Sequence, residues 1–399
     1  MDEIKLQPEL LKAFTELGYS EWTEIQLKTI PLIQEGKDVI GQSYTGSGKT
    51  AAFGFPILEK IEPRKGIQSL ILVPTRELCE QVTQEMRKFA KHKRTNILSI
   101  YGGVAIGPQM DRLPQAEIVV GTPGRILDHI GRHTINLTRV KILVLDEADK
   151  MFEMGFIDDV KEIISYVAQN RQTLLFSATI STQVHEIVAN YMKNPVRIKA
   201  QSYVDEEKLT QFYYSVSNKD KFSLLSHLLQ EKGSGLSIVF CATRNRVDVI
   251  AKNLYKQGVN AIAIHGGLSQ NRRKRAIDLF HGNKVDVLVA SDVAARGLDI
   301  KNVVQIINYD SPKNSKEYIH RIGRTARAGS EGKVISLIAE PDHENFNNVL
   351  EDRSLPVEKL ALPDFKRIPF FVGERRPMGH HGQQRYPRQH GRFGARRGN

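Results

Sequence analysis

The amino-acid sequence predicts an α/β protein built from two tandem doubly wound parallel sheets. Short apolar runs rich in β-branched residues alternate with amphipathic stretches of helical period, a pattern typical of β–α units around a parallel sheet. The pattern occurs twice, and a polar segment separates the two occurrences. The length of 399 residues fits this organisation, because a single hydrophobic core stops growing at roughly 250 to 300 residues.

Apolar runs mark the expected strands of the two sheets. The first sheet is expected to contain the runs at residues 69–74, 96–101, 117–123, 141–149 and 173–179. The second is expected to contain those at 237–243, 261–267, 286–292, 303–310 and 334–339. Between them, residues 199–210 are polar and lack a clear apolar period, which is typical of an interdomain linker. The expected units are a first domain at 1–200, a linker at 201–208, a second domain at 209–365 and a tail at 366–399.

The C-terminal tail carries half of the net charge of the chain. The whole sequence has 57 Lys and Arg against 45 Asp and Glu, a net charge of +12. Residues 371–399 contribute seven Arg and one Glu, or +6, and few large apolar groups. This composition cannot repay the entropy of ordering, so we expect a disordered basic arm. Its arginines and aromatic residues would suit RNA, and the alternative is a terminus that only keeps the protein soluble.

Composition excludes several classes of protein. Two cysteines, Cys79 and Cys241, are too few for a disulfide framework or a zinc cage. No uncharged apolar run approaches the roughly 18 residues of a membrane helix. The first residues carry acids where a secretion signal would carry Lys or Arg. We therefore expect a cytoplasmic protein in a reducing compartment.

A phosphate-binding loop is predicted within DVIGQSYTGSGKTAAFGF, residues 38–55. A short strand, a glycine-bearing loop and an Ala-rich helix start form the context in which backbone N–H groups bind phosphates. Here Lys49 would reach the β and γ phosphates of ATP, and the Thr50 hydroxyl would bind Mg²⁺. The strict pattern has Gly at position 43, and the alternative is a Gly/Ser-rich surface turn. The expected nucleotide-binding residues are Ser43, Thr45, Gly46, Ser47, Gly48, Lys49 and Thr50.

Two adjacent carboxylates follow the apolar run KILVL, in the sequence DEAD at residues 146–149. Ligands of open parallel sheets bind outside the carboxyl ends of the strands, so Asp146 and Glu147 are expected to face the phosphate-binding loop. Asp146 can hold Mg²⁺, and Glu147 can polarise the attacking water as a general base. An acidic strand end alone is often only a helix cap, but the upstream loop favours the catalytic interpretation.

Arginines of the second domain supply a third chemical signal. In YIHRIGRTARAG, Arg321, Arg324 and Arg327 recur every three residues, so at a helix start they would project from roughly one face. Arginines so placed can stabilise charge on a transferring phosphoryl group, and the alternative is a solvated basic helix. Because the phosphate-binding groups are expected in one domain and these arginines in the other, ATP would close a cleft between the domains.

In their order and spacing, these segments resemble the motifs of a DEAD-box RNA helicase of superfamily 2. The resemblance covers residues 4–340 and implies two RecA-like domains. It implies that Tyr19 stacks on adenine and that Gln26 bonds the edge of the base. It also implies nucleotide contacts from Gly297 and Asp299, and γ-phosphate contacts from Arg324 and Arg327. The residues that it implies for coupling hydrolysis to strand separation are Ser177, Thr179, Asp149 and His320.

The same resemblance implies an RNA track across both domains. Its residues are small side chains, loop amides and isolated arginines, which suit sugar and phosphate rather than base edges, so binding would not depend on sequence. For any one of them the alternative is a structural role, such as an ion pair of Arg76 with a neighbouring acid. The implied RNA-binding residues are Pro74, Thr75, Arg76, Gly102, Gly103, Thr122, Pro123, Gly124, Arg125, Thr243, Arg244, Gln270, Arg273 and Ser291.

Some positions depart from the family pattern. Ser43 replaces the usual Ala, and Ser291 replaces the usual Thr and keeps the hydroxyl. Trp22 and Glu24 occupy positions where the family favours proline, so the adenine-sensing segment lacks two stiff residues.

The resemblance implies an ATP-dependent RNA helicase that unwinds short RNA duplexes or remodels RNA–protein complexes by closure of its two domains. ATP and Mg²⁺ are the expected cofactors, and RNA is the expected partner. Ribonucleoproteins or helicase-regulating proteins are further expected partners, and the chain is expected to be a monomer that binds no membrane. The alternatives are an ATP-gated RNA clamp or annealing chaperone that acts through its basic tail, and a translocating DNA helicase.

Overall fold

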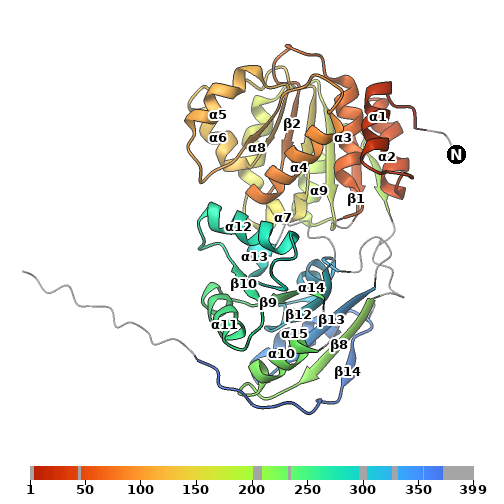
Figure 1. The fold of residues 1–399 in the computed structure, drawn as a ribbon. Helices are drawn as coiled ribbons and strands as arrows, with labels where there is room; N and C mark the ends of the chain where they lie inside the picture. The colour runs from red at the N-terminus through yellow and green to blue at the C-terminus, as the bar shows by residue number, and fades with distance from the viewer. Residues whose placement is uncertain are drawn as a thin grey trace, which may run out of the picture.

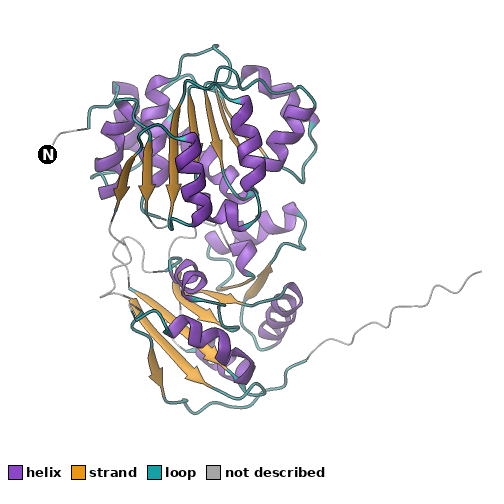
Figure 2. Ribbon diagram, turned by 180° about the vertical axis from the view of Figure 1, so that it is seen from behind, coloured by secondary structure: helices purple, strands orange, loops and turns teal. Residues whose placement is uncertain are grey.

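Two seven-stranded parallel sheets with helices on both faces make up the computed structural model of the chain (Figures 1 and 2). The structure describes residues 4–43, 46–200, 209–231, 235–295, 303–325, 331–353 and 355–371. The two doubly wound domains predicted from the sequence are therefore confirmed. Within the described ranges, no helix has the length and apolar character needed to cross a membrane.

The strands of the first sheet lie in the order β3-β4-β2-β5-β6-β1-β7. Each expected apolar run of this domain overlaps one of them. They are β1 (Val39–Gln42), β2 (Ser69–Leu72), β3 (Ile97–Ile100), β4 (Ile118–Gly121), β5 (Ile142–Leu145), β6 (Gln172–Ser177) and β7 (Val196–Lys199). The helices are α1 (Pro8–Glu16), α2 (Glu24–Gln34), α3 (Lys49–Lys60), α4 (Arg76–Phe89), α5 (Gly107–Arg112), α6 (Pro123–Gly131), α7 (Ala148–Glu153), α8 (Ile157–Tyr166) and α9 (Thr182–Tyr191), with a short 3₁₀ helix at Leu113–Gln115.

The strands of the second sheet lie in the order β10-β11-β9-β12-β13-β8-β14. They are β8 (Leu209–Ser215), β9 (Leu236–Phe240), β10 (Ala261–Ile264), β11 (Val287–Ala290), β12 (Val303–Asn308), β13 (Gly332–Ile338) and β14 (Glu358–Leu360). The helices are α10 (Lys221–Gln230), α11 (Arg244–Lys256), α12 (Gln270–His281), α13 (Asp292–Ala295), α14 (Ser315–Ile322) and α15 (His343–Leu350), with a 3₁₀ helix at Glu340–Asp342.

The two sheets share one topology. When strands are counted from the first strand of each domain, both sheets have the order 3-4-2-5-6-1-7. Loops that follow corresponding strands therefore occupy corresponding places in the two domains. In Figure 2 the strands of the first sheet point towards the second domain. The carboxyl edge of the first sheet, where ligands of such sheets bind, therefore faces the second domain.

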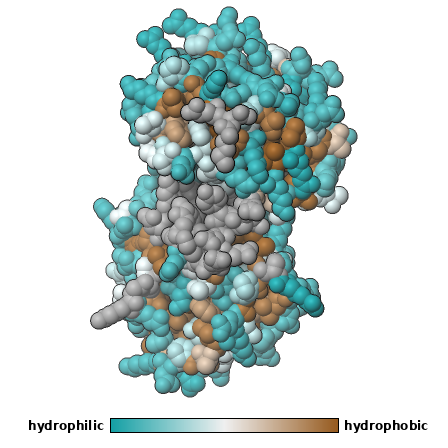
Figure 3. Space-filling model, turned by 90° about the vertical axis from the view of Figure 1, so that its right-hand side faces the viewer, coloured by the Kyte–Doolittle hydropathy of each residue, from teal (hydrophilic) through white to brown (hydrophobic). Residues whose placement is uncertain are grey.

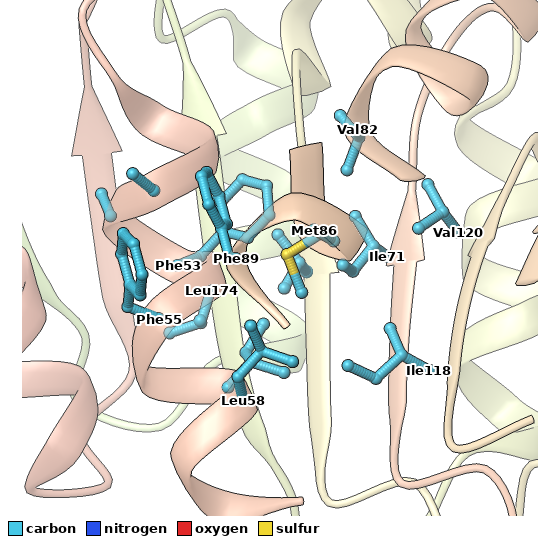
Figure 4. Close-up of a cluster of buried hydrophobic side chains, with 14 of the residues drawn as sticks. Phe53, Phe55, Leu58, Ile71, Val82, Met86, Phe89, Ile118, Val120 and Leu174 are labelled. Atoms are coloured by element: carbon cyan, nitrogen blue, oxygen red, sulfur yellow. The ribbon is translucent and has the colours of Figure 1, made fainter. Parts of the chain in front are cut away.

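The core of the first domain fixes the helix that follows the phosphate-binding loop. Phe53 and Phe55 of α3 lie beside Met86 and Phe89 of α4 in a buried cluster over the sheet (Figure 4). The rings of Phe55 and Phe89 stack with centroids 4.6 Å apart. Gly54 lets the helices approach, because a Cβ there would lie 2.7 Å from the Met86 sulfur. Burial on this scale contributes roughly 1.5–3 kcal/mol for each large apolar side chain and holds α3 in place.

An extended segment at residues 361–371, here called the C-terminal strap, runs along the outside of the second domain (Figure 1, blue). Phe370 packs on Phe222 of α10 with ring centroids 4.9 Å apart. The Phe371 N–H donates to Asn253 Oδ1 at 3.0 Å, and Asn253 Nδ2 donates to the Phe371 carbonyl at 2.9 Å. The strap is therefore part of the second domain.

The strap changes one expected boundary. The sequence places residues 366–371 in the tail, whereas in the structure they contact α10 and α11, because Ile368 packs against the core of the second domain and Phe370 packs on Phe222. The expected linker at 201–208 and the tail residues 372–399 lie outside the described residues. Figure 3 shows one face of the molecule, on which hydrophilic side chains predominate and hydrophobic ones form small groups.

Candidate functional site

The loop between β1 and α3 has the backbone shape of a phosphate-binding loop. Gly46 and Gly48 have φ angles of 91° and 90°, in the left-handed region that favours glycine. Gly48 is the N-cap of α3, and a Cβ there would lie 2.3 Å from Gln26 Nε2. The buried Lys49 ammonium donates to the Ser43 carbonyl at 3.0 Å. A cation and a helix N-terminus therefore meet at this loop, which is the arrangement that binds phosphate.

Gln26 connects this loop to the segment before α2. Its Nε2 donates to the Gly48 carbonyl at 3.0 Å, and its Oε1 accepts from the Thr23 N–H at 2.9 Å. The Thr23 hydroxyl donates to the Ser47 carbonyl at 2.9 Å. Since Gln26 is only 1% exposed, these contacts give it a role in the geometry of the loop. Its contact with adenine stays a prediction.

Trp22 is fixed by aromatic contacts. Its ring stacks on Phe14 with centroids 4.1 Å apart and meets Phe55 edge-on at 5.7 Å. Tyr19 also stacks on Phe14, at 5.1 Å, and is 38% exposed. Aromatic packing therefore holds the segment in which the family has prolines, and it leaves part of Tyr19 accessible.

Asp146 and Glu147 lie buried where β5 ends. Burial raises the pKa of Asp146 to about 6, in spite of the nearby Lys49 ammonium. Glu147 has a left-handed φ of 49°, which is rare outside glycine and asparagine, and its Oε1 accepts from the Lys150 ammonium at 2.8 Å. Burial alone would raise the pKa of Glu147. The cations of Lys150, Lys49 and Arg324 outweigh burial and lower that pKa to about 2. Glu147 is therefore ionised at neutral pH, whereas burial makes ionisation of Asp146 less favourable than that of a free aspartate.

The expected coupling residues of the first domain form one hydrogen-bonded group. Asp149 Oδ2 accepts from the N–H and from the hydroxyl of Thr179, both at 2.9 Å. The Asp149 N–H donates to Ser177 Oγ at 3.2 Å, and the Ser177 hydroxyl donates to the Thr179 carbonyl at 2.7 Å. Burial opposes ionisation of Asp149, but several neighbours, including His320 of the second domain, lower its pKa. The end of β6 and the start of α7 are thus linked, and the second domain lies within electrostatic reach.

The expectation that the arginines of the second domain project from one helix face is wrong. Helix α14 ends one residue after Arg321, so Arg324 lies beyond it. Arg321 is buried and pairs with Asp292 through two contacts of 2.6 and 2.8 Å, which assigns it to the interior of its own domain. Arg324 is 3% exposed and lies close enough to Glu147 to lower its pKa. Arg324 is therefore the described arginine of this segment whose charge acts on the first domain.

Polar contacts join the two domains directly. Glu77 of α4 accepts from Gln270 Nε2 at 3.2 Å and from Arg273 Nη2 at 3.0 Å, both on α12. Glu153 of α7 forms an ion pair with Lys316 of α14. The carboxyl edge of the first sheet is therefore covered by the second domain. Gln270 and Arg273 were expected to bind RNA, and that role stays a prediction.

The two domains use threonine in the same way at corresponding loops. Thr75 follows β2 and caps α4 by accepting from the Leu78 N–H at 3.2 Å. Thr243 follows β9, the corresponding strand, and caps α11 by accepting from the Arg246 N–H at 3.2 Å. Each threonine is therefore a helix cap, whatever contact it makes with RNA.

The arginine after each capping threonine lies against a pair of glycines. A Cβ on Gly103, after β3, would lie 1.8 Å from Arg76 Nη1. A Cβ on Gly266, after β10, would lie 3.4 Å from Arg244 Nη2. Both glycine pairs follow the third strand of their domain, so the same combination of capped helix, arginine and glycine loop is built twice. The expected RNA-binding residues of the two halves are thereby placed in matching positions.

The remaining expected residues fall into two groups. Arg125 Nη2 donates to the Val104 carbonyl at 3.1 Å and so contacts the loop after Gly103. Others lie where β2, β3, β4 and β11 end: Pro74, Gly102, Thr122, Pro123, Gly124 and Ser291. Those outside the described residues are Thr45, Gly297, Asp299 and Arg327.

Sequence reasoning missed four charged residues of this site. Glu77 and the pair of Glu153 with Lys316 join the domains, and only the fold reveals which side chains meet there. The ion pair of Lys150 with Glu147 could have been predicted, because the two residues are three apart at the start of a helix, where such side chains are neighbours.

Comparison with known proteins agrees with this geometry. The chain matches the DEAD/DEAH box helicase family over residues 23–187 and the helicase conserved C-terminal domain over residues 220–329. The ATP-dependent RNA helicase CshA of Listeria monocytogenes is 46% identical over 379 residues, 94% of this chain and 72% of that protein. The DEAD-box ATP-dependent RNA helicase CshA of Bacillus subtilis is 44% identical over 365 residues, 90% of this chain and 74% of that protein.

Solved structures give the same result for the fold. Saccharomyces cerevisiae Dbp5 bound to RNA and ADP BeF3 is 32% identical, with a TM-score of 0.81, over 89% of this chain and 94% of that chain. Mss116 bound to ssRNA and AMP-PNP is 28% identical, with a TM-score of 0.78, over 90% of this chain and 78% of that chain. The two sheets are therefore tandem RecA-like domains, and the chain belongs to the DEAD-box family of ATP-dependent RNA helicases.

Proposed function

We propose that this protein separates short RNA duplexes, or remodels RNA–protein complexes, by closing its two domains on ATP and RNA. Membership of the family makes it an RNA-dependent ATPase and helicase. The observation that carries the mechanism is the burial of Arg324 of the second domain, at 3% exposure, within electrostatic reach of Glu147 of the first. Because the residues for one reaction come from both domains, ATP binding and domain closure are linked.

ATP is proposed to bind at the loop between β1 and α3. The N–H groups at the start of α3 and the Lys49 ammonium would hold its phosphates, and Tyr19 would contact the base. The donor set also fits magnesium, because Asp146 offers a buried carboxylate and Thr50 a hydroxyl at the helix start. A bound Mg²⁺ would neutralise charge on the phosphates. Together these groups would keep the γ-phosphate against the two carboxylates of β5.

Hydrolysis is proposed to use Glu147 and Arg324 in different roles. Glu147 would orient the attacking water and accept its proton. Arg324 would stabilise the charge that develops on the γ-phosphoryl group, a role typically worth about 10³ to 10⁵ in rate. Hydrolysis would take place beside Asp146 and Glu147 at the end of β5. The hydrogen bonds of Asp149 to Thr179 and Ser177 would transmit a shift of this segment to the end of β6. The step needs the second domain, so the reaction would stop whenever the domains separate.

RNA is proposed to bind along the duplicated loops. The two Thr–Arg–Gly combinations would offer backbone N–H groups and guanidinium groups to sugar and phosphate, so binding would not depend on the RNA sequence. RNA held by both domains would be strained when they close, and this would separate a short duplex before hydrolysis. Magnesium use, the individual RNA contacts and a monomeric state are all part of this proposal.

A strand-displacement assay tests the proposal. The native protein is expected to release a short RNA strand from a duplex when ATP is present. The Lys49→Ala protein is expected to lose this activity, because its loop lacks the cation for the phosphates. The Glu147→Gln protein is expected to bind ATP and RNA but not to turn over. Activity that persists in the Lys49→Ala protein would instead support the alternative of an annealing chaperone, and stimulation of the ATPase by DNA in place of RNA would support a DNA helicase.

A further inference from the structure

The proposed function does not use the ion pair of Glu147 with Lys150. The Lys150 ammonium donates to Glu147 Oε1 at 2.8 Å, and the two side chains are 2% and 3% exposed. Taking two charges out of water costs more free energy than burying an apolar pair of the same volume. A buried pair at this place therefore contributes little to stability and calls for another explanation.

The position of the pair on the chain suggests that explanation. Both residues lie within one turn at the start of α7, and Asp149 of the same turn is held by Thr179. The backbone of this turn is therefore fixed, and the Lys150 side chain extends from it to Oε1 of the Glu147 carboxylate. By contrast, the terminal torsion of a glutamate has a broad energy minimum, so the carboxylate plane is free to rotate unless a partner holds it.

The surrounding charges make such a partner necessary. Lys49 and Arg324 also act on Glu147, from the phosphate-binding loop and from the second domain. Without Lys150, the attraction on the carboxylate would depend more on Arg324, which moves with the second domain. Lys150 belongs to the same turn as Glu147, so its contact with Oε1 does not depend on the position of the second domain.

We propose that Lys150 is a positioning residue that holds the Glu147 carboxylate by Oε1 and so directs Oε2 at the attacking water. The inference rests on the proposed function, because it takes Glu147 as the general base. In the step, the water oxygen forms a bond to the γ-phosphorus, its proton goes to Oε2, and the bond from that phosphorus to the β-phosphate oxygen breaks. Lys150 takes no proton and contacts neither water nor nucleotide.

Kinetics of two Lys150 variants test this role. The Lys150→Met protein keeps the length of the side chain without the ammonium, and the Lys150→Arg protein keeps both charge and donor. At saturating ATP and RNA, Lys150→Met is expected to lower kcat by about 10- to 100-fold, the size of effect that misplacement of a reacting group produces. The ATP concentration for half-saturation is expected to stay within about threefold, because ground-state binding is not affected. Lys150→Arg is expected to retain most of kcat.

A second comparison remains informative if Lys150→Met does not fold. The double variant Glu147→Gln with Lys150→Met leaves no unpaired buried carboxylate, so it avoids that cause of instability. It is expected to bind ATP and RNA as tightly as the Glu147→Gln protein, because Lys150 acts only through the carboxylate. Weaker ATP binding by the double variant would overturn the proposal, since Lys150 would then act on the nucleotide or on the fold.

Other outcomes separate this inference from the proposed function. A folded Lys150→Met protein with native or higher kcat would show that the pair does not orient Glu147, and would leave the helicase assignment intact. A native protein without RNA-stimulated ATPase activity would refute the proposed function itself, before any Lys150 variant is compared.

Discussion

The ion pair of Glu153 with Lys316 is predicted to stabilise the closed arrangement of the two domains. It joins α7, which follows the DEAD carboxylates, to α14 of the second domain. The side chains are 28% and 36% exposed. An ion pair at this exposure contributes roughly 0.5–1 kcal/mol, less at high salt. Lys316→Glu removes that attraction and adds a repulsion of similar size, so we expect a loss of about 1–2 kcal/mol, or about 5- to 25-fold in the closing equilibrium.

RNA affinity in the presence of a non-hydrolysable ATP analogue measures this loss. Fluorescence anisotropy of a labelled single strand is expected to show about 5- to 25-fold weaker binding for Lys316→Glu and for Glu153→Lys. The double variant Glu153→Lys with Lys316→Glu restores the pair in reverse and is expected to bind within about threefold of native. Lys313→Glu, at an exposed position three residues away, makes the same charge change and serves as the matched control.

Two results would refute this reasoning. If both single variants bound RNA as the native protein does, the pair would contribute nothing to closure. If the double variant were as weak as the product of the single effects, the two side chains would act independently of each other. Affinity without the ATP analogue should be the same for all these proteins, because the pair forms only when the domains meet.

Further predictions follow from single residues. Arg324→Ala is expected to lower ATP turnover by about 10³-fold or more, because its charge comes from the second domain; a steady-state rate near native would mean that ATP does not bridge the domains. Gly103→Ala is expected to weaken RNA binding by about tenfold, since φ is 82° and a Cβ would lie 1.8 Å from Arg76 Nη1; Gly107→Ala, with open space around it, is the control, and equal affinity of the two variants would contradict the prediction. Deletion of residues 372–399 is expected to reduce the slope of log affinity for RNA against log salt concentration by several units, and to leave ATP turnover at saturating RNA unchanged. An unchanged slope would mean that the tail does not bind RNA and serves only to keep the protein soluble.

The central strands could be predicted because a strand covered on both faces is apolar throughout. All four residues of β5 are buried, for example, and they form the core of a continuous apolar run. The edge strand β7 shows no such run, because Arg197 and Lys199 are exposed on it. β14 is exposed over most of its three residues. These two strands have few buried apolar residues, so their sequences carry little signal, whereas β3 and β10 at the opposite edges of the two sheets are apolar and were predicted.

The site was predictable where chemistry and local backbone coincide. The glycines of the phosphate-binding loop need left-handed angles, and Ser177, Thr179 and Asp149 do meet, as the resemblance implied. Arg321 was misassigned because a spacing of three residues does not reveal that the helix ends before Arg324. Pairs across the domain interface could not be predicted, since no local pattern specifies which surfaces of two domains face each other.

The C-terminal strap determines where the remaining chain begins. Asn253, which holds Phe371, lies nine residues after Arg244 on α11, or about 14 Å along the helix axis. Each further residue adds at most about 3.5 Å of chain, so the four or five residues that lead to Arg375 and Arg376 span at most about 14 to 17.5 Å, which matches the distance along α11 to Arg244. If Arg244 binds RNA as proposed, arginines tethered at this distance from it would act at a local concentration set by geometry, whatever the concentration of the protein in solution. Because Asn253 holds Phe371 on α11, the basic segment that follows would stay near the proposed RNA-binding residue of the same helix.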